Sequence, residues 1–257
     1  MRLSRFSRLL QGKNPFSPPP CRTALARRYI RGSGIEIGAL HSPLAVPAGV
    51  TVRYVDRMTR AECIRTFPEL DPARIVDPDY VTDGFTLDAV EDASQDFVIA
   101  NHVLEHTPNT LGALAAWHRV LRSNGVLFAT VPIVDRTFDR GRTLTPPQHM
   151  WEDWQEMGVS SRVAAHDLPH YREWVAISLR AISRQNGTPL PEWDSVEIDR
   201  IAREKLQVSE EIHFHTFSTE SFRELLTQVA PRLMPDLRLA ELRECDAFEA
   251  VAVLVKE

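Results

Sequence analysis

The sequence predicts an α/β protein whose core is a doubly wound, mostly parallel sheet of seven strands. Three observations support this. Short apolar segments alternate with helical patterns in the first half of the chain, a long irregular segment follows the fifth strand, and two more strands close the sequence. Strands alternating with helices form parallel sheets with right-handed crossovers. At 257 residues the chain can form one such domain with insertions.

The first half of the chain contains the first three expected strands. The elements expected here are a helix at 23–31, strands at 33–37 and 51–55, a helix at 58–70 and a strand within 74–81. The segment 51–55 is β-branched and aromatic, as strands are. Pro78 lacks an amide hydrogen and therefore makes the third strand short.

The second half completes the sheet around a long insertion. We expect strands at 97–100 and 126–131, a helix at 109–121 between them, a helix at 219–229 capped by Ser218 or Thr219, and closing strands at 237–242 and 248–256. The continuous apolar run 97–100 suits a central strand covered on both faces. The last two strands are expected to pair as an antiparallel hairpin.

These elements divide the chain into four regions. They are an N-terminal extension at 1–22, a cofactor-binding core at 23–135, a largely helical insertion covering the substrate at 136–210, and a C-terminal completion of the sheet at 211–257. The prolines at 18–20 cannot continue a helix, which places the start of the domain just after them.

Composition gives no support for some classes of partner. A net charge of -5 offers no bulk attraction to nucleic acid or to an anionic membrane, and no run approaches the roughly 20 apolar residues that span a bilayer. The cysteines, Cys21, Cys63 and Cys245, are scattered and odd in number, so we expect reduced thiols, no zinc cluster and a cytoplasmic location. A homodimer is compatible with this composition.

The strand ends carry candidate cofactor ligands, because parallel sheets bind nucleotides beyond the carboxyl ends of their strands. Gly38 turns the chain directly after a strand that contains Glu36. Asp56 ends the second strand, 20 positions after Glu36, which is the usual spacing for an acid that binds ribose hydroxyls.

Two linked motifs add a resemblance to a known family. Residues 96–106, which end in Leu-Glu-His, and residues 120–127, which contain a Leu-Arg-x-x-Gly turn, resemble the region around strand four of class I S-adenosylmethionine-dependent methyltransferases. Residues 34–40 resemble motif I of that family, although Ala39 stands where a second glycine is usual. The resemblance implies a Rossmann-like fold and S-adenosylmethionine as cofactor.

The resemblance also implies roles for individual residues. Asp56 would bind the ribose, and Arg57 would lie against the adenine. Asp83 would accept a hydrogen bond from the adenine amine. The full set expected around the cofactor is Glu36, Gly38, Ala39, Ser42, Asp56, Arg57, Asp83, Gly84, Asn101, His102 and His106. His106 has an alternative interpretation, in which Glu105 and His106 simply begin a helix.

The segment after strand five is expected to meet the acceptor. Residues 138–149 resemble a bacterial subgroup associated with glycan methylation, which implies O-methylation of a saccharide hydroxyl. Such a reaction needs a base of near-neutral pKa, and His149 is the candidate. Asp153 lies four positions later, so on a helix it would share a face with His149 and orient it. Alternatively, His149 is a structural or surface histidine without a catalytic role.

Other residues are candidates for acceptor binding. They are Asp135, Asp139, Trp151, His213 and His215. His213 and His215 would share one face of a strand. Asp135, Asp139 and Glu152 alternatively offer oxygen ligands for Mg²⁺.

Three other functions compete with sugar O-methylation. A nicotinamide-dependent oxidoreductase would need a G-x-G-x-x-G turn, which residues 38–43 do not provide. A methyltransferase acting on a non-sugar small molecule remains an alternative. A non-catalytic binding module would have a degenerate cofactor pocket, whereas the expected ligands are present.

Overall fold

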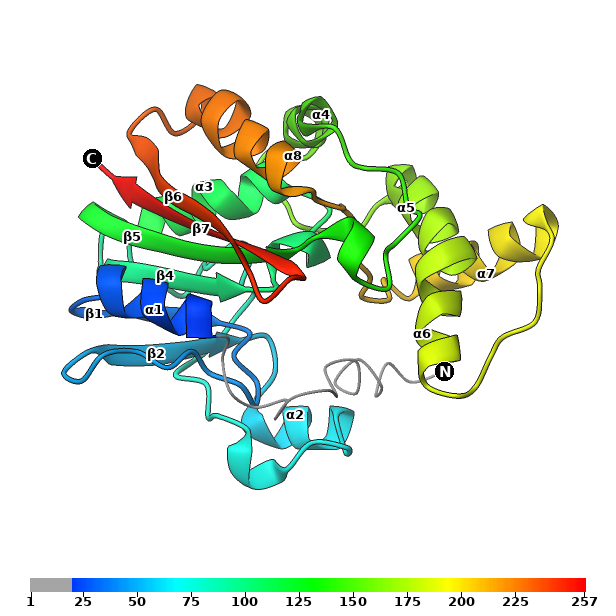
Figure 1. The fold of residues 1–257 in the computed structure, drawn as a ribbon, viewed down its shortest axis with the longest axis horizontal. Helices are drawn as coiled ribbons and strands as arrows, with labels where there is room; N and C mark the ends of the chain where they lie inside the picture. Colours follow the sequence, from blue (N-terminus) through cyan, green and yellow to red (C-terminus); the bar gives the residue numbers. More distant parts are fainter. Residues whose placement is uncertain (1–19) are drawn as a thin grey trace.

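The computed structural model describes residues 20–257 and contains one seven-stranded sheet in the order β3-β2-β1-β4-β5-β7-β6 (Figure 1). Strands β1 to β5 run parallel to one another, whereas β7 runs antiparallel to both β5 and β6. The strands are β1 Ser33–Ile37, β2 Thr51–Asp56, β3 Tyr80–Val81, β4 Gln95–Asn101, β5 Leu121–Pro132, β6 Leu237–Cys245 and β7 Glu249–Lys256. The predicted fold class and C-terminal hairpin are confirmed.

Eight α-helices surround the sheet within the described residues. They are α1 Pro20–Tyr29, α2 Arg60–Thr66, α3 Thr110–Val120, α4 Pro147–Met157, α5 Leu168–Glu173, α6 Leu179–Gln185, α7 Ser195–Gln207 and α8 Thr219–Glu224. A π-helical turn at Trp174–Ser178 joins α5 to α6, and another at Leu225–Val229 extends α8. Each helix in this part of the chain is too short or too polar to cross a bilayer.

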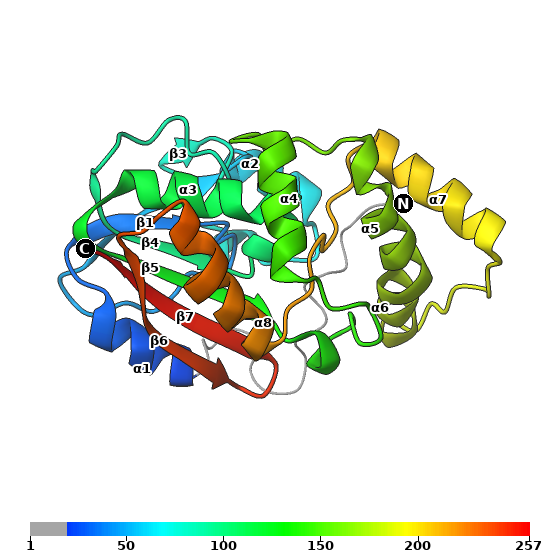
Figure 2. The ribbon, with the colours of Figure 1, turned by 90° about the horizontal axis from the view of Figure 1, so that it is seen from above.

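Helices cover both faces of the sheet (Figure 2). Alternate residues of β4 face opposite sides: Phe97 and Ile99 pack in the cluster that contains α1, and Val98 and Ala100 pack in the cluster that contains α3 and α8. This two-sided burial explains the continuous apolar run of β4. The close packing also requires Gly34, because a Cβ there would lie 2.2 Å from the carbonyl oxygen of Phe97.

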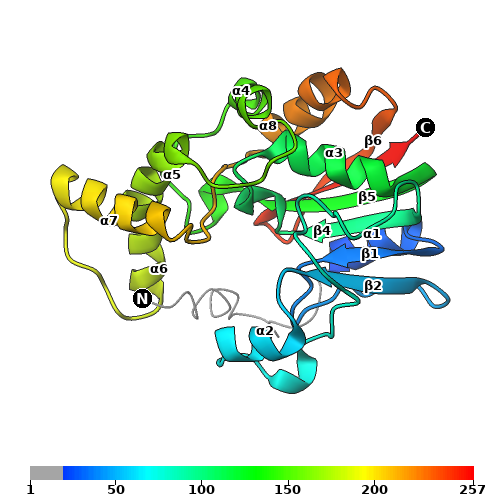
Figure 3. The ribbon, with the colours of Figure 1, turned by 180° about the vertical axis from the view of Figure 1, so that it is seen from behind.

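A helical lobe made of α5, α6 and α7 lies beyond the carboxyl ends of the parallel strands (Figures 1 and 3). The lobe has a hydrophobic core of its own, which includes Tyr171, Trp174 and Ala202. The helical insertion after strand five was predicted, and α4 lies where the His149 to Asp153 spacing required a helix. The four-region division remains a prediction, and most of its first region lies outside the described residues.

The segment 211–216 differs from the expected strand. It has no regular secondary structure, and only Phe217 forms a β-bridge, with Ile133. Other contacts fix the segment: Phe214 N donates to Glu105 O at 2.7 Å. The side chains of His213 and His215 therefore do not share a strand face, and they enter two different clusters.

The prediction of reduced thiols is wrong for two of the three cysteines. Cys21 and Cys245 form a disulfide that joins α1 to the end of β6, 224 positions away in sequence. Cys63 is free and buried. The pairing was missed because the sequence separation gives no sign that α1 packs against the hairpin. Disulfides are more typical of oxidising compartments, and the cytoplasmic location remains a prediction.

Candidate active site

The carboxyl ends of β1, β2 and β4 meet on the side of the helical lobe. Ile37 pairs with Val55 on one side and with Ala100 on the other, so the residues that follow these strands are neighbours. Gly38 N donates to Val55 O at 2.9 Å. The structure thus brings the predicted residues Gly38, Asp56 and Asn101 to one edge of the sheet.

Glu36 shapes the turn after β1 from inside the protein. The amide of Leu44 donates to both Glu36 oxygens at 3.0 Å, and Asn101 Nδ2 donates to Oε1 at 3.3 Å. Burial raises the pKa of Glu36 to about 7, although these hydrogen bonds oppose the shift. Gly38 has φ +64°, which favours glycine. Glu36 therefore holds the turn at 38–44 in place.

Two acids flank the expected nucleotide site. Asp56 Oδ1 accepts a hydrogen bond from Met58 N at 2.9 Å, and burial raises the pKa of Asp56. Asp83 Oδ1 accepts from Phe85 N at 2.7 Å, and its other oxygen accepts from Ser161 Oγ at 2.8 Å. Asp83 thus connects the cofactor edge to the segment between α4 and α5.

The remaining residues of the predicted set also lie at these turns. Ser42 N donates to Ala39 O at 2.9 Å within the turn after β1. Arg57 forms an ion pair with Glu211. Gly84 lies close to β1, since a Cβ there would be 2.5 Å from Ile37 Cγ2.

The residues at this edge fit S-adenosylmethionine. Asn101 Oδ1 is buried and has no hydrogen-bond partner within the described part of the chain. It is an acceptor that the ammonium group of a methionine moiety would satisfy. Together with Gly38 and Asp56 it can hold the cofactor, which when bound supplies a methyl group on a positively charged sulfur.

His102 is a charged residue next to this edge. Its Nε2 lies 2.7 Å from Glu249 Oε2 and its Nδ1 lies 3.4 Å from Glu105 Oε1. Burial lowers the pKa of His102, but its hydrogen bonds with Glu105 and Glu249 raise it more, to about 9. His102 is therefore an imidazolium at neutral pH, which makes it a poor general base.

A buried polar cluster centred on Asp139 lies beside the end of β4. Asp139 accepts hydrogen bonds from Arg142 Nη1 at 3.1 Å and Ser178 Oγ at 2.7 Å, and its Oδ2 lies 2.6 Å from His213 Nδ1. The ring of His213 contacts that of His106 edge-on, with centroids 4.6 Å apart. Burial would raise the pKa of Asp139, but His213 and Arg142 hold it below its usual range.

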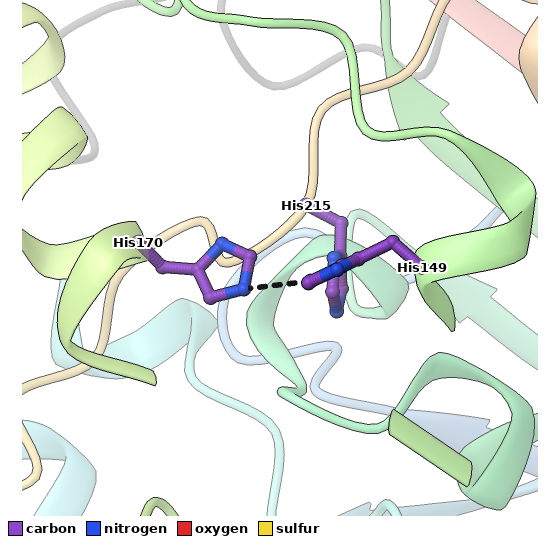
Figure 4. A group of neighbouring side chains, drawn as sticks. All are labelled: His149, His170 and His215. Atoms are coloured by element: carbon purple, nitrogen blue, oxygen red, sulfur yellow. Dashed lines mark hydrogen bonds between the residues drawn. The ribbon is translucent and has the colours of Figure 1, made fainter. Parts of the chain in front are cut away.

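A second cluster contains three histidines from three separate segments (Figure 4). His149 on α4 and His170 on α5 face one another, with their Nε2 atoms 3.2 Å apart. His215 comes from the irregular segment before α8, and its Nε2 lies 3.1 Å from Pro108 O. Burial lowers the pKa of His170 to about 4 and lowers that of His215 well below its usual value.

Asp153 also belongs to this three-histidine cluster. Its Oδ2 lies 3.6 Å from His149 Nε2 and 3.8 Å from His215 Nε2. The shared helix face of His149 and Asp153 was thus predicted from their spacing. Burial raises the pKa of Asp153 to about 7, and the negative charges of Asp167, Glu152 and Glu156 contribute.

Several expected acceptor residues do not come together. Asp135 and Glu152 are exposed, and Asp139 is buried. Within residues 20–257, two groups of three or more ligand-type side chains lie close together, and neither contains Asp135 or Glu152. The Mg²⁺ site expected from these three acids therefore has no support in the structure.

Aromatic residues of the insertion have different environments. Trp174 is 1% exposed and belongs to the lobe core. Trp151 is half-buried, and the guanidinium of Arg232 lies 5.1 Å from its ring centroid. Trp151, which was expected to bind the acceptor, is therefore partly accessible, whereas Trp174 is not.

Sequence reasoning missed three residues of these clusters. Arg142 is 1% exposed in its side chain and donates to the carbonyl oxygens of His213 and Phe214 as well as to Asp139. His170 and Glu249 approach from separate elements. Arg142 lies within the segment 138–149 that resembled glycan-modifying enzymes, and that was its only signal.

The comparisons with known proteins agree with the core fold. Residues 34–129 match the family model described as a methyltransferase domain. None of the curated proteins matches the chain. Among solved structures, an S-adenosylmethionine-dependent methyltransferase from Methanosarcina mazei is 15% identical, with 89% of this chain and 95% of that chain covered and a TM-score of 0.41.

A second solved structure, described as a possible histamine N-methyltransferase from Thermotoga maritima, is 16% identical. The alignment covers 92% of this chain and 94% of that one, with a TM-score of 0.44. Similarity at this level does not extend to the acceptor. The family match coincides with β1 to β5 and with the turns that carry Gly38, Asp56 and Asn101. Over residues 34–129 the chain is therefore similar to the methyltransferase-domain family, and these residues form the parallel part of a Rossmann-like sheet.

Proposed function

We propose that this protein transfers a methyl group from S-adenosylmethionine to an acceptor hydroxyl, on a saccharide in the first instance, with His213 as general base. The observation behind this proposal is the 2.6 Å contact between His213 Nδ1 and Asp139, next to His106 at the carboxyl end of β4. This contact supports the proposal because it gives an imidazole oriented by a carboxylate next to the turn that follows β4, close to the expected cofactor residues.

The chemistry requires such a group. Methyl transfer from a sulfonium is an in-line displacement, so the acceptor must be aligned with the methyl group and its hydroxyl must lose a proton. A carboxylate bound to Nδ1 fixes the tautomer of an imidazole and stabilises the imidazolium that forms when Nε2 takes a proton. Asp139 remains ionised, because His213 and Arg142 hold its pKa below the usual range.

His149 was the base expected from the sequence. Its Nε2 lies 3.2 Å from His170 and 3.6 Å from Asp153, so its closest polar partner is another imidazole. An imidazole does not stabilise a neighbouring imidazolium as a carboxylate does. For this reason we assign the base to His213 and retain His149 as the alternative.

The saccharide acceptor is proposed from a different part of the chain. It comes from the resemblance of residues 138–149 to glycan-modifying enzymes, and the half-buried Trp151 lies on α4 directly after that segment. A non-sugar hydroxyl compound would use the same base. A non-catalytic binding module would bind the cofactor without forming any methylated product.

The test is product formation by the full chain with isotopically labelled S-adenosylmethionine and a panel of sugars, followed by mass spectrometry. General-base catalysis contributes roughly 10²- to 10⁴-fold in rate, so His213→Gln should lower turnover by about that factor. Calorimetry should find its affinity for S-adenosylhomocysteine unchanged. His118→Gln is the matched control, because His118 pairs with Asp236 at the far end of α3.

Three outcomes would change the assignment. Full turnover by His213→Gln together with loss of turnover by His149→Gln would move the base to His149. A parallel loss of cofactor affinity in His213→Gln would indicate a structural role. If labelled product forms with a non-sugar acceptor and with none of the sugars, the saccharide assignment is wrong.

A further inference from the structure

The three-histidine cluster has the geometry of a metal site. His149, His170 and His215 each offer one nitrogen, and these nitrogens all lie within 4.8 Å of one another (Figure 4). Around a tetrahedral Zn²⁺ with bonds of about 2.0 to 2.1 Å to nitrogen, two ligand nitrogens lie about 3.3 Å apart. The Nε2 atoms of His149 and His170 are 3.2 Å apart. This pair already has the separation of two ligands of one ion.

His215 shows why a hydrogen-bond network alone does not account for the cluster. Its Nε2 faces the carbonyl oxygen of Pro108, so this nitrogen carries the hydrogen and Nδ1 carries the lone pair. Nδ1 is buried, on a residue that is 0% exposed, and it has no hydrogen-bond partner among residues 20–257. A lone pair buried without a donor is unfavourable, and a bound cation would satisfy it.

The partners of these rings match those of metal-bound histidines. A ligating histidine typically donates its other ring N–H to a carboxylate or backbone carbonyl, which fixes the tautomer. His215 does this with Pro108, and His170 has a hydrogen bond with the backbone of Phe214. Two of the three rings therefore already have the backbone partner that a metal-bound histidine needs.

Asp153 adds a carboxyl group to the same place. Its Oδ2 is buried without a hydrogen-bond partner in the described structure, and it lies within 4 Å of nitrogens of both His149 and His215. A cation between these groups would pair with this carboxylate. Three imidazoles and one carboxylate are ligands that Zn²⁺ and related transition metals prefer, whereas Mg²⁺ prefers oxygen ligands throughout.

We propose that His149, His170 and His215, with Asp153 beside them, bind one divalent transition-metal ion, Zn²⁺ in the first instance. Pro108 lies just after the Leu104–His106 turn, which follows β4, so the ion would lie on the acceptor side of the cofactor edge. The side chain of His149 is 40% exposed, which leaves access from solvent. We further infer that the ion binds the oxygen of the acceptor hydroxyl and lowers the pKa of that hydroxyl. This second inference rests on the proposed function.

The first test measures metal binding without any methyl transfer. The full chain is stripped with a chelator and titrated with Zn²⁺ by calorimetry and with Co²⁺ by visible absorption, which reports tetrahedral coordination. We expect one ion per chain. Loss of a group that hydrogen-bonds to a metal ligand typically lowers metal affinity 10- to 100-fold, so loss of a ligand itself in His170→Gln should lower it about 100-fold or more.

The control is His166→Gln, a histidine in the same insertion whose side chain is 29% exposed and pairs with Glu156. It should keep the wild-type affinity. His149→Gln is the second ligand variant, and thermal unfolding verifies that each variant folds. The metal site is refuted if the stripped wild type binds no ion, or if His170→Gln and His149→Gln bind as tightly as His166→Gln.

A second measurement separates this inference from the proposed function. His213→Gln lies outside the ligand set and should bind Zn²⁺ like the wild type while losing turnover. Metal binding with no methylated hydroxyl product would uphold the site and refute the acceptor. If the wild type binds Zn²⁺ in the titration but the metal-free enzyme methylates the acceptor at the full rate, the role of the ion at the acceptor oxygen is refuted.

Discussion

Substitution of Asp139 is expected to lower the free energy of unfolding substantially. It is 1% exposed and bonds to three groups: the guanidinium of Arg142, the hydroxyl of Ser178 and the imidazole of His213. Removing one member of a buried ion pair costs about 3 to 5 kcal/mol, because the partner charge is left uncompensated. The amide of Asp139→Asn keeps one acceptor oxygen, so we expect its free energy of unfolding to fall by about 3 kcal/mol.

Urea denaturation monitored by tryptophan fluorescence would measure this loss. Asp135→Asn is the matched control, since Asp135 is exposed only four positions away and a surface change of this kind usually stays within about 0.5 kcal/mol. The pKa of Asp139 is lower in the folded than in the unfolded protein. Its stabilising effect is therefore present above the unfolded pKa of about 3.9 and is lost as the pH falls through the folded pKa.

The difference between wild type and Asp139→Asn should accordingly be largest near neutral pH and shrink in acid. Equal stability of Asp139→Asn and Asp135→Asn at pH 7 would refute the argument. So would a difference that does not change between pH 7 and acid.

Four further predictions follow from other features. Asp56→Ala should weaken binding of S-adenosylhomocysteine by about 1.5 to 3 kcal/mol in calorimetry, the usual value of a charged hydrogen bond, and unchanged affinity would remove the ribose assignment. Cys21→Ser should lower the free energy of unfolding by about 2 to 5 kcal/mol, a difference that a reducing agent must abolish if the disulfide with Cys245 is its cause. The pKa of His102 is raised to about 9 in the folded protein, so the stability it confers is complete below the unfolded value of about 6.5 and is lost as the pH rises through 9. The free energy of unfolding of His102→Gln should not fall in this way as the pH rises. If it falls as much as that of the wild type, His102 is not the cause of the decline. Hydrogen exchange over 136–210 should slow when cofactor and acceptor bind, whereas slow exchange that is the same with and without ligands would indicate a fixed scaffold rather than a cover.

The cofactor edge could be predicted from sequence because it depends on local patterns. Apolar runs identified the strands, and the parallel sheet then placed Gly38, Asp56 and Asn101 together through its register. The role of Glu36 in holding the turn after β1 was harder to predict. Its burial and its hydrogen bonds with Leu44 depend on how the turn folds back, which spacing alone does not indicate.

The acceptor side was predictable only where it depends on one helix. The pairing of His149 with Asp153 follows from the helical repeat of α4. His170 joins them from another helix, 21 positions later, and His215 reaches them from a segment without regular structure. These approaches depend on tertiary packing of the lobe, for which neither periodicity nor a motif gives a signal.

The separate hydrophobic core of the lobe has an evolutionary consequence. Tyr171, Trp174 and Ala202 pack among themselves, whereas the sheet has its own two apolar clusters. Substitutions inside the lobe can therefore reshape what it contacts while the sheet keeps its fold and its nucleotide edge. Homologues are expected to diverge fastest in this lobe, so that a lineage could acquire a new acceptor without first losing its methyl donor.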